Sequence, residues 1–395
     1  MVVLLYGYYT SNNFGDDLFK IIFEKYLHTH NKEYIIYSPP KLLTDYKTLS
    51  NVTTILLGGG EIINDYFMIP LFTFINHHEL FKIPIYGISI GYDDSLPIKY
   101  LNFIDRCIFR NNISIIDNNR YFKQHDIVFS LKYIIDNNLL HKNIESNTFG
   151  YYLIDSINDE KYNVLLNFTN KIKDKYKIKF TLFHKTKDIH IVNRLIHDCD
   201  LINYSCIDLR NYIDFIQEII NTEKHLCLRY HSHIICYLYN LPFISFPLTS
   251  KTLNFNKEFN IEYSFDTDVM LNTVDNNNII FNDVMFDYTI MDNILNPINA
   301  SDENTIIEKN KTYWSQFTEV YNNFIKIYSN ISNLNDYDIL KYSNYITDQI
   351  EKCIFDNTNS NYRYGIFVKV NTLFKSNIPI NYNLQNNFIK IITDI

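Results

Sequence analysis

The chain has 395 residues, a net charge of −8, 46% hydrophobic residues and 20% charged residues. This length allows two domains with cores of their own and an appendage, and the hydrophobic share is that of a globular protein. The negative charge argues against a nucleic-acid partner, since phosphate binding needs a basic face.

Cysteine usage and hydropathy bear on the compartment. The six cysteines show no Cys-x-x-Cys spacing, which is typical of buried thiols in a reducing compartment. The N-terminal segment Met1–Gly7 lacks a basic region, so we interpret it as a first strand and not as a signal peptide. No stretch approaches the roughly 18 apolar residues of a membrane span. We therefore expect a soluble, cytoplasmic protein with no membrane span.

The first 150 residues alternate between short apolar runs and longer mixed segments. The runs predict strands at Val2–Tyr6, Tyr34–Tyr37, Thr54–Leu57, Ile83–Gly87, Arg106–Phe109 and Ile127–Phe129. The mixed segments predict helices around Asp17–His28, Ile69–Leu80, Lys99–Ile104 and Asp117–His125. Continuous apolar strands that alternate with helices indicate a parallel sheet covered on both faces.

A second alternation begins near Gly150. It predicts strands at Phe149–Ile154, Lys179–His184, Ile202–Tyr204, Lys224–Leu228 and Pro242–Ser245. It predicts helices at Asp159–Tyr176, Lys187–Cys199, Leu209–Asn221 and Ser232–Leu238. We expect an α/β fold of two Rossmann-like domains, residues 1–148 and 149–300, that face a cleft in a GT-B-like arrangement. Residues 301–395, with a long amphipathic helix at Asp302–Tyr328, are interpreted as a helical appendage of unassigned role.

Seven of the nine glycines fall within the first 91 residues, where strands are followed by loops. The loop Gly7–Asp17 leads into a helix N-terminus, which suits an anion or a sugar hydroxyl, although Asp16 or Asp17 can equally be a plain N-cap. Gly58, Gly59 and Gly60 follow an apolar strand, and three glycines favour a ligand that lies against bare backbone over a simple turn. Neither loop matches a P-loop or the dinucleotide fingerprint.

A third segment of interest is Arg229-Tyr230-His231-Ser232-His233. Arginine is rare in this chain, seven against 29 lysines, so Arg229 is expected to use its planar guanidinium. At the end of a buried strand, Arg229 could clamp a phosphate or carboxylate and His231 could move a proton. A surface pair or a satisfied core group is the alternative. His233 is interpreted as structural, and no metal is predicted because no Cys or carboxylate stands at ligand spacing.

Two further strand ends carry a polar side chain into a helix. Phe109–Ser114 contains Arg110, and Phe183–Asp188 contains His184. Neither segment identifies a function by itself.

Taken in order, these segments resemble the polysaccharide pyruvyl transferase family. The family's G-x-x-N-x-G-D loop has its counterpart in the segment that ends at Asp16, with Asn13, Gly15 and Asp16 in register. The remaining motifs of the family are G-G-G-x-x-x-x-D, Y-G-x-x-I-G, R-D-x-x-S and R-L-H-x-x-I with a later Pro and Lys. Their counterparts here are Gly58 to Asp65, Tyr86 to Gly91, Arg110 to Ser114, and Arg229 to Ile234 with Pro242 and Lys251. The resemblance spans residues 1 to 330.

The chain departs from the family pattern at four positions. Tyr230 stands in place of Leu, Asn111 in place of Asp and Tyr92 in place of Pro, and the aspartate expected after the following strand is read as Ser130. The Arg and the His of the hallmark remain, so an enzyme is expected. A degenerate, non-catalytic glycan-binding protein is the alternative that these departures leave open.

The resemblance implies transfer of a pyruvyl group from phosphoenolpyruvate to two hydroxyls of a sugar, which forms a ketal without a cofactor. Arg229, with Arg110 or Lys251, would hold the donor's phosphate and carboxylate, and His231 would be the acid–base. The acceptor glycan would meet the first domain's loops. The other substrate-binding residues on this interpretation are Asn13, Asp16, Gly58, Gly59, Gly60, Asp65 and His184. The oligomeric state stays open.

The nearest rival function is a GT-B glycosyltransferase that uses a nucleotide sugar. It would share the fold and the cleft. Such enzymes usually carry a carboxylate in the second domain for the ribose, and none is evident near Ser245–Lys251.

Overall fold

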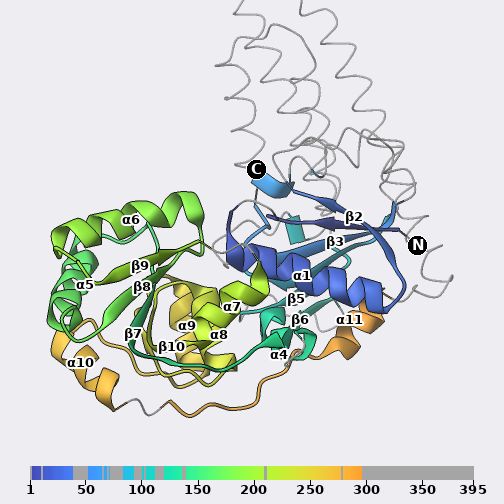
Figure 1. The fold of residues 1–395 in the computed structure, drawn as a ribbon. Coiled ribbons are helices and arrows are strands. Elements are labelled where there is room, and N and C mark those ends of the chain that lie inside the picture. Colours follow the sequence, from blue (N-terminus) through green and yellow to red (C-terminus); the bar gives the residue numbers. More distant parts are fainter. Residues whose placement is uncertain are drawn as a thin grey trace, which may run out of the picture.

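The structure is a computed structural model. It describes residues 2–9, 12–38, 52–64, 66–68, 71, 83–92, 100–101, 104–111, 120–135, 139–208, 211–276 and 279–295. Within these ranges the chain forms two parallel sheets flanked by helices (Figure 1). The predictions for Asp65, for all of Ile69–Leu80 except Leu71, for half of Lys99–Ile104 and for the appendage at 301–395 lie outside the described residues.

The first sheet has the strand order β2-β1-β3-β4-β5-β6, and all of its neighbouring strands are parallel. Its elements are β1 (Val2–Tyr6), α1 (Phe14–Thr29), β2 (Glu33–Tyr37), β3 (Val52–Gly60), β4 (Ile85–Ile90), β5 (Arg106–Phe109) and β6 (Tyr121–Lys123). The first five predicted strands are confirmed.

The end of this sheet differs from the sequence prediction. The predicted helix Asp117–His125 contains the strand β6, and the predicted strand Ile127–Phe129 is the 3-10 helix η2 (Ile127–Ser130), followed by α4 (Leu131–Ile134). Asp126 caps η2 by accepting from the Val128 N–H at 2.9 Å, and the Ile127 N–H donates to Ser89 Oγ at 2.9 Å. The apolar run is therefore buried as a helical turn whose backbone is satisfied by side chains, and not as a paired strand.

The second sheet has the order β11-β10-β7-β8-β9 and is also parallel throughout. Its elements are β7 (Glu145–Tyr152), α5 (Asp159–Ile172), β8 (Lys177–Thr181), α6 (Lys185–Asp198), β9 (Tyr204–Ile207), α7 (Tyr212–Ile220), β10 (Thr222–Cys227), α8 (Tyr230–Leu238) and β11 (Phe243–Ser245). Three helices that were not predicted follow: α9 (Ser250–Glu258), α10 (Thr267–Asp275) and α11 (Tyr288–Leu295). The predicted fold class, an α/β fold of two Rossmann-like domains in a GT-B-like arrangement, is confirmed.

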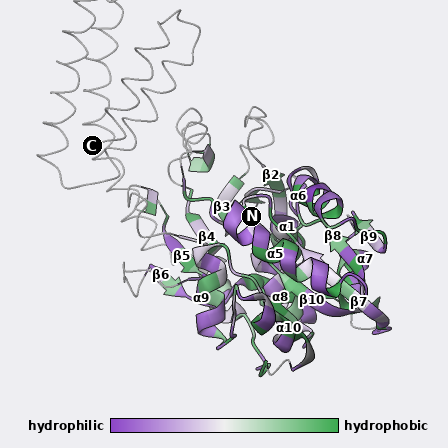
Figure 2. Cartoon of the chain, turned by 90° about the vertical axis from the view of Figure 1, so that its left-hand side faces the viewer, coloured by the Kyte–Doolittle hydropathy of each residue, from purple (hydrophilic) through white to green (hydrophobic). Residues whose placement is uncertain are grey.

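Hydrophobic residues are common in the strands and on the inner sides of the helices, whereas polar residues mark the outer helix faces (Figure 2). In the described part of the chain, no helix combines the length and the apolar character that a membrane crossing requires.

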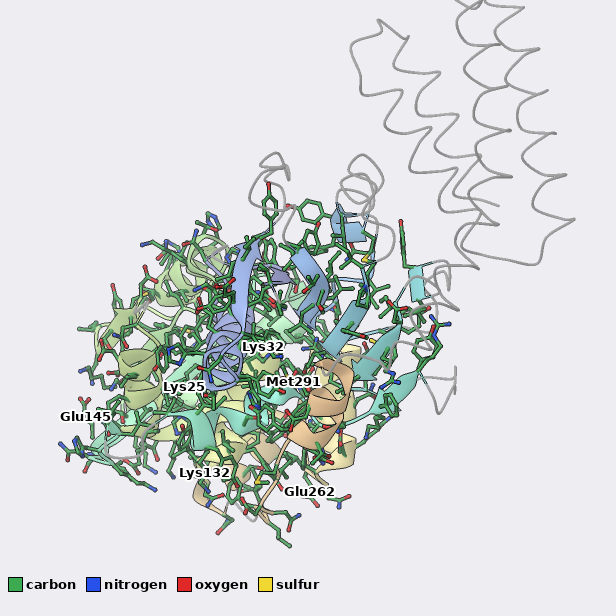
Figure 3. All side chains as sticks on the ribbon, turned by 90° about the vertical axis from the view of Figure 1, so that its right-hand side faces the viewer. Lys25, Lys32, Lys132, Glu145, Glu262 and Met291 are labelled. Atoms are coloured by element: carbon green, nitrogen blue, oxygen red, sulfur yellow. The ribbon has the colours of Figure 1, made fainter. Side chains whose placement is uncertain are left out.

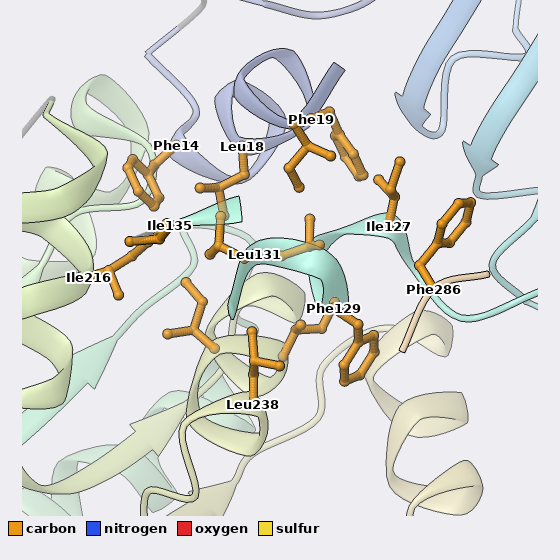
Figure 4. Close-up of a cluster of buried hydrophobic side chains, with 14 of the residues drawn as sticks. Phe14, Leu18, Phe19, Ile127, Phe129, Leu131, Ile135, Ile216, Leu238 and Phe286 are labelled. Atoms are coloured by element: carbon orange, nitrogen blue, oxygen red, sulfur yellow. The ribbon is translucent and has the colours of Figure 1, made fainter. Parts of the chain in front are cut away.

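One hydrophobic core is shared by both domains. Along α1, buried residues at Phe14, Leu18 and Ile22 recur every four positions, so one face of the helix is apolar. This face packs on η2 and α4 of the first domain and on α7 and α8 of the second (Figure 4). Phe14 is at the centre: its ring stacks on Phe215 at 3.5 Å between centroids, and its N–H donates to the Phe183 carbonyl at 2.7 Å.

The chain returns to the first domain after α10. The Tyr288 ring stacks on Tyr26 of α1 at 5.5 Å, and the buried Met291 of α11 lies in the shared core (Figure 3). Tyr26 Oη also donates to the Asp292 carboxylate. The segment from Tyr288 to Asp292, which we expected to belong to the second domain, contacts α1 of the first domain.

The shared core generates a stability prediction for Phe14→Ala. Removing a buried ring that contacts both domains should lower the free energy of unfolding by about 3–5 kcal/mol. Chemical denaturation followed by circular dichroism measures this change. Tyr133→Ala, which removes a half-exposed ring, is the control and should cost far less. A loss for Phe14→Ala no larger than that of the control would contradict the shared core.

Candidate functional site

The site lies where the carboxyl ends of the two sheets meet. The loop after β1 and the loop after β8 pair with each other through an antiparallel bridge between Asn13 and His184. On the far side of this bridge the Lys185 N–H donates to the Asn12 carbonyl at 3.1 Å. The N-termini of α1 and α6 are thereby held side by side, and each contributes a positive dipole end.

Arg110 extends from the end of β5 toward the second domain. It is 6% exposed, its Nη1 donates to Asp126 Oδ2 at 3.1 Å, and its guanidinium lies 4.7 Å from the centre of the Tyr230 ring. A Cβ on Gly91 would come within 2.8 Å of Arg110 Nη2, so this glycine makes room for the guanidinium. Tyr230, a departure from the family pattern, therefore covers a cation of the other domain.

Asp126 is the functional residue that the sequence interpretation missed. It follows β6, is 1% exposed and forms the buried ion pair with Arg110. Burial raises the pKa of Asp126, although Arg110 acts in the opposite direction. Ser130, which we took to stand in place of the family's aspartate, is the last residue of η2. An Asp directly before an apolar turn is an N-cap pattern, and this pattern is the sequence signal for Asp126.

His231, in the first turn of α8, points across the domain interface. Its side chain is 12% exposed, and its Nε2 lies 4.0 Å from Asp126 Oδ2. Nε2 has no hydrogen-bond partner among the described residues. A Cβ on Gly15 would overlap His231 Nδ1. Burial, and then the cations Arg110, Lys251 and Arg229, lower the pKa of His231 well below its usual value, so the imidazole is neutral at pH 7.

Arg229 is fixed by Asp188 and by the backbone. Its Nη2 pairs with the Asp188 carboxylate, and its Nε donates to the Leu153 carbonyl at 3.1 Å. Asp188 also accepts from the His184 N–H at 2.8 Å, which ties the ion pair to the N-terminus of α6. The His184 Nε2 is buried without a partner in the described part of the chain. Burial and the neighbouring Arg229 lower the pKa of His184.

Lys251 approaches the same place from the first turn of α9. Its Nζ lies 3.4 Å from Glu61 Oε1, and the same oxygen lies 4.0 Å from Arg110 Nη2. Burial lowers the pKa of Lys251. Glu61, which follows Gly58–Gly60, thus links Arg110 of the first domain to Lys251 of the second domain.

Asp16 lies among these cations at the N-terminus of α1. Asn13 Nδ2 donates to its carboxylate, and a Cβ on Gly60 would stand 3.2 Å from its Oδ1. Burial raises the pKa of Asp16 to about 7, although Lys251, Arg110 and Arg229 act in the opposite direction. Asp16 is therefore a carboxyl group that can exchange a proton near neutral pH.

The glycine loop has a different role from the one predicted. A Cβ on Gly58 would overlap Tyr9 Oη, and a Cβ on Gly59, at φ +57°, would overlap the Phe19 ring. The expectation that a ligand lies against bare backbone was wrong for these two glycines, whose Cα faces are covered by the chain's own aromatic rings. Tyr9 is 1% exposed and donates to the Gly58 carbonyl at 3.2 Å.

The structure brings together most of the predicted site residues. Three cations, Arg110, Arg229 and Lys251, lower the pKa of His231 in addition to burial, and each faces a carboxylate. His233 is structural as interpreted: its two ring nitrogens lie 2.8 Å from the Arg229 carbonyl and from Ser245 Oγ. Within the described ranges, no group of three or more His, Cys, Asp or Glu side chains is placed to hold a metal ion.

The sequence matches no protein-family model, and a search of curated proteins also returns no match. Solved structures are similar in fold. UDP-GlcNAc 2-epimerase of Methanocaldococcus jannaschii, in complex with UDP-GlcNAc and UDP, has 9% identity and a TM-score of 0.49, over 72% of this chain and 96% of that one.

Two further solved structures are similar to the same degree. UDP-N-acetylglucosamine 2-epimerase of Rickettsia bellii has 13% identity and a TM-score of 0.47, over 71% of this chain and 88% of that one. An alpha-glucosyltransferase in complex with UDP and a 13-mer DNA has 13% identity and a TM-score of 0.43, over 70% and 89%. Likeness at this level carries no argument about substrate or reaction.

The packing of Gly15 against His231 predicts a rescue. Gly15→Ala should lower the melting temperature, because the new methyl group overlaps the imidazole. In a His231→Ala background the same change should be neutral or stabilising by roughly 0.5–1 kcal/mol, since alanine favours the helix. Thermal melts of the four proteins in this cycle measure the coupling. Equal effects of Gly15→Ala in both backgrounds would refute the contact.

The raised pKa of Asp16 predicts a pH dependence of stability. The folded state holds this proton up to about pH 7, whereas the unfolded chain releases it near pH 4. The stabilising contribution is therefore complete below pH 4 and is lost as the pH rises through 7. Asp16→Asn should gain melting temperature relative to the wild type between pH 4 and pH 8. If the difference in melting temperature between Asp16→Asn and the wild type stayed constant from pH 4 to pH 8, the raised pKa of Asp16 would be contradicted.

Proposed function

We propose that the chain is a transferase that moves a pyruvyl group from phosphoenolpyruvate to two hydroxyls of a sugar. The observation that carries this proposal is the set of Arg110, Arg229 and Lys251 around a neutral His231 at the domain interface. A small donor with a phosphate at one end and a carboxylate at the other needs cations at two places. Arg110 comes from the first domain, whereas Arg229 and Lys251 come from the second.

The electrostatics favour an anionic ligand at this place. Burial, and then the cations Arg110, Lys251 and Arg229, lower the pKa of His231, so three basic side chains lie near a neutral imidazole. The helices α1, α6, α8 and α9 all begin here, and their N-termini also favour negative charge. We assign the phosphate to Arg229 beside α6, and the carboxylate to Arg110 and Lys251.

The proposed steps use two proton carriers. The Asp16 carboxyl protonates the methylene carbon of the donor while the first sugar hydroxyl attacks the adjacent carbon and passes its proton to His231. The second hydroxyl then attacks the same carbon as the bond to the phosphate oxygen breaks. Its proton returns to the Asp16 carboxylate, and the phosphate leaves with the proton of His231. The atoms balance as one ketal and one phosphate per donor.

Asp126 and Asp188 act in this scheme as positioning residues. Asp126 holds Arg110 and faces His231 Nε2 at 4.0 Å, while Asp188 holds Arg229. With Nδ1 packed against Gly15, the imidazole would use Nε2, which has no hydrogen-bond partner among the described residues, for proton transfer.

A nucleotide sugar is the second candidate donor. The helices α8 and α9 begin after the adjacent strands β10 and β11, and two neighbouring N-termini with Lys251 would suit a diphosphate. Against this donor, three of the site carboxylates, Glu61, Asp126 and Asp188, are paired with cations.

Phosphate release from phosphoenolpyruvate, measured with a panel of sugar acceptors, tests the proposal. The wild type should release phosphate only with an accepted sugar. Arg229→Ala and His231→Ala should each lower kcat/KM by about a hundredfold or more, because one loses the phosphate clamp and the other the base.

Matched controls are available outside the site. Arg194→Ala and His197→Ala change the same residue types on the exposed face of α6 and should leave the rate unchanged. No release with any sugar, together with turnover of a UDP-sugar, would overturn pyruvyl transfer in favour of the second candidate.

A further inference from the structure

Glu61 lies between Arg110 of the first domain and Lys251 of the second domain. Its Oε1 lies 3.4 Å from Lys251 Nζ and 4.0 Å from Arg110 Nη2, so one carboxylate oxygen is shared by both cations. Its stem passes over Gly91, where a Cβ would stand 3.0 Å from Glu61 Cγ. The Glu61 carboxylate thus lies between an arginine and a lysine, in the position that the carboxylate of a ligand could take.

Glu61 differs from the other carboxylates of the site in its exposure. Its side chain is 58% exposed, whereas the side chains of Asp126 and Asp188 are at most 1% exposed. If the Asp126 or the Asp188 side chain moved away, a buried cation would be left without a partner, which is costly. Glu61 can rotate into solvent at small cost, because an exposed ion pair contributes little and Arg110 keeps Asp126 as a partner.

We infer that Glu61 is an internal stand-in for the ligand: its carboxylate fills an anion subsite of Arg110 and Lys251 and is displaced when the carboxylate of the donor binds. The inference rests on the proposed function for the identity of the donor. It adds that the chain competes with its own substrate at one end of the site. The phosphate subsite at Arg229 has no exposed competitor of this kind among the described residues.

Titration calorimetry of the full chain with phosphoenolpyruvate, in low salt and without an acceptor, tests the inference. Glu61→Gln removes the competing charge with little change of shape, and should bind phosphoenolpyruvate about threefold to tenfold tighter than the wild type. The gain should vanish in the double variant Glu61→Gln/Lys251→Gln, because the subsite then lacks its second cation.

Glu258→Gln is the matched control. The Glu258 Oε1 is likewise shared by two basic groups, Lys123 Nζ at 3.2 Å and His125 Nδ1 at 3.0 Å, and it also joins the two domains. It lies at the end of α9 away from Lys251, so its substitution should leave the affinity unchanged. If Glu258→Gln raised the affinity for phosphoenolpyruvate as much as Glu61→Gln does, the change in net charge alone would explain the gain, and the inference would be overturned.

Two further probes separate the ends of the donor. Pyruvate carries only the carboxylate, and its affinity should rise in Glu61→Gln; the affinity for inorganic phosphate should not. A gain with phosphate alone, equal or weaker binding of phosphoenolpyruvate by Glu61→Gln, or no binding by either protein would overturn the subsite. Tighter binding without any phosphate release would keep the subsite and remove the transferase proposal, so the two can fail separately.

Discussion

The contact between the loop after β1 and the loop after β8 is the constraint on which the rest of the structure depends. Phe14 stacks on Phe215, and the neighbouring Asn13 pairs with His184 of the second domain. The carboxyl ends of two separate sheets are thereby joined. Arg110 can then lie over Tyr230, and His231 can lie against Gly15. A site made by two domains follows from this contact, because neither domain alone holds the cations and the imidazole together.

Burial decides how the site is charged. Burial and three neighbouring cations keep His231 neutral, and burial raises the pKa of Asp16 to about 7. Each cation meets a carboxylate, but with different consequences: the pairs made by Asp126 and Asp188 are enclosed, whereas Glu61 is open to solvent. The enclosed pairs fix geometry, because breaking one would leave a buried charge without a partner. The open pair is the part of the site that can change when an anion arrives.

The sequence predicted the sheets and the polar strand ends well, because continuous apolar strands and the edge rule for parallel sheets are local signals. It failed where an apolar run had two possible structures: Ile127–Phe129 forms a helical turn because Asp126 and Ser89 satisfy its backbone. The glycines of Gly58–Gly59 were assigned to a ligand, although aromatic rings from α1 and the preceding loop cover them. Contacts of this kind depend on the packing of distant segments, which periodicity does not report.

A crystal structure of the full chain with phosphoenolpyruvate tests the central claim, a single anion site built by both domains, most directly. The account predicts a donor with its phosphate on Arg229 and its carboxylate on Arg110 and Lys251, and with the Glu61 side chain turned into solvent. A donor held by one domain only, or a donor bound with Glu61 still between Arg110 and Lys251, would contradict it.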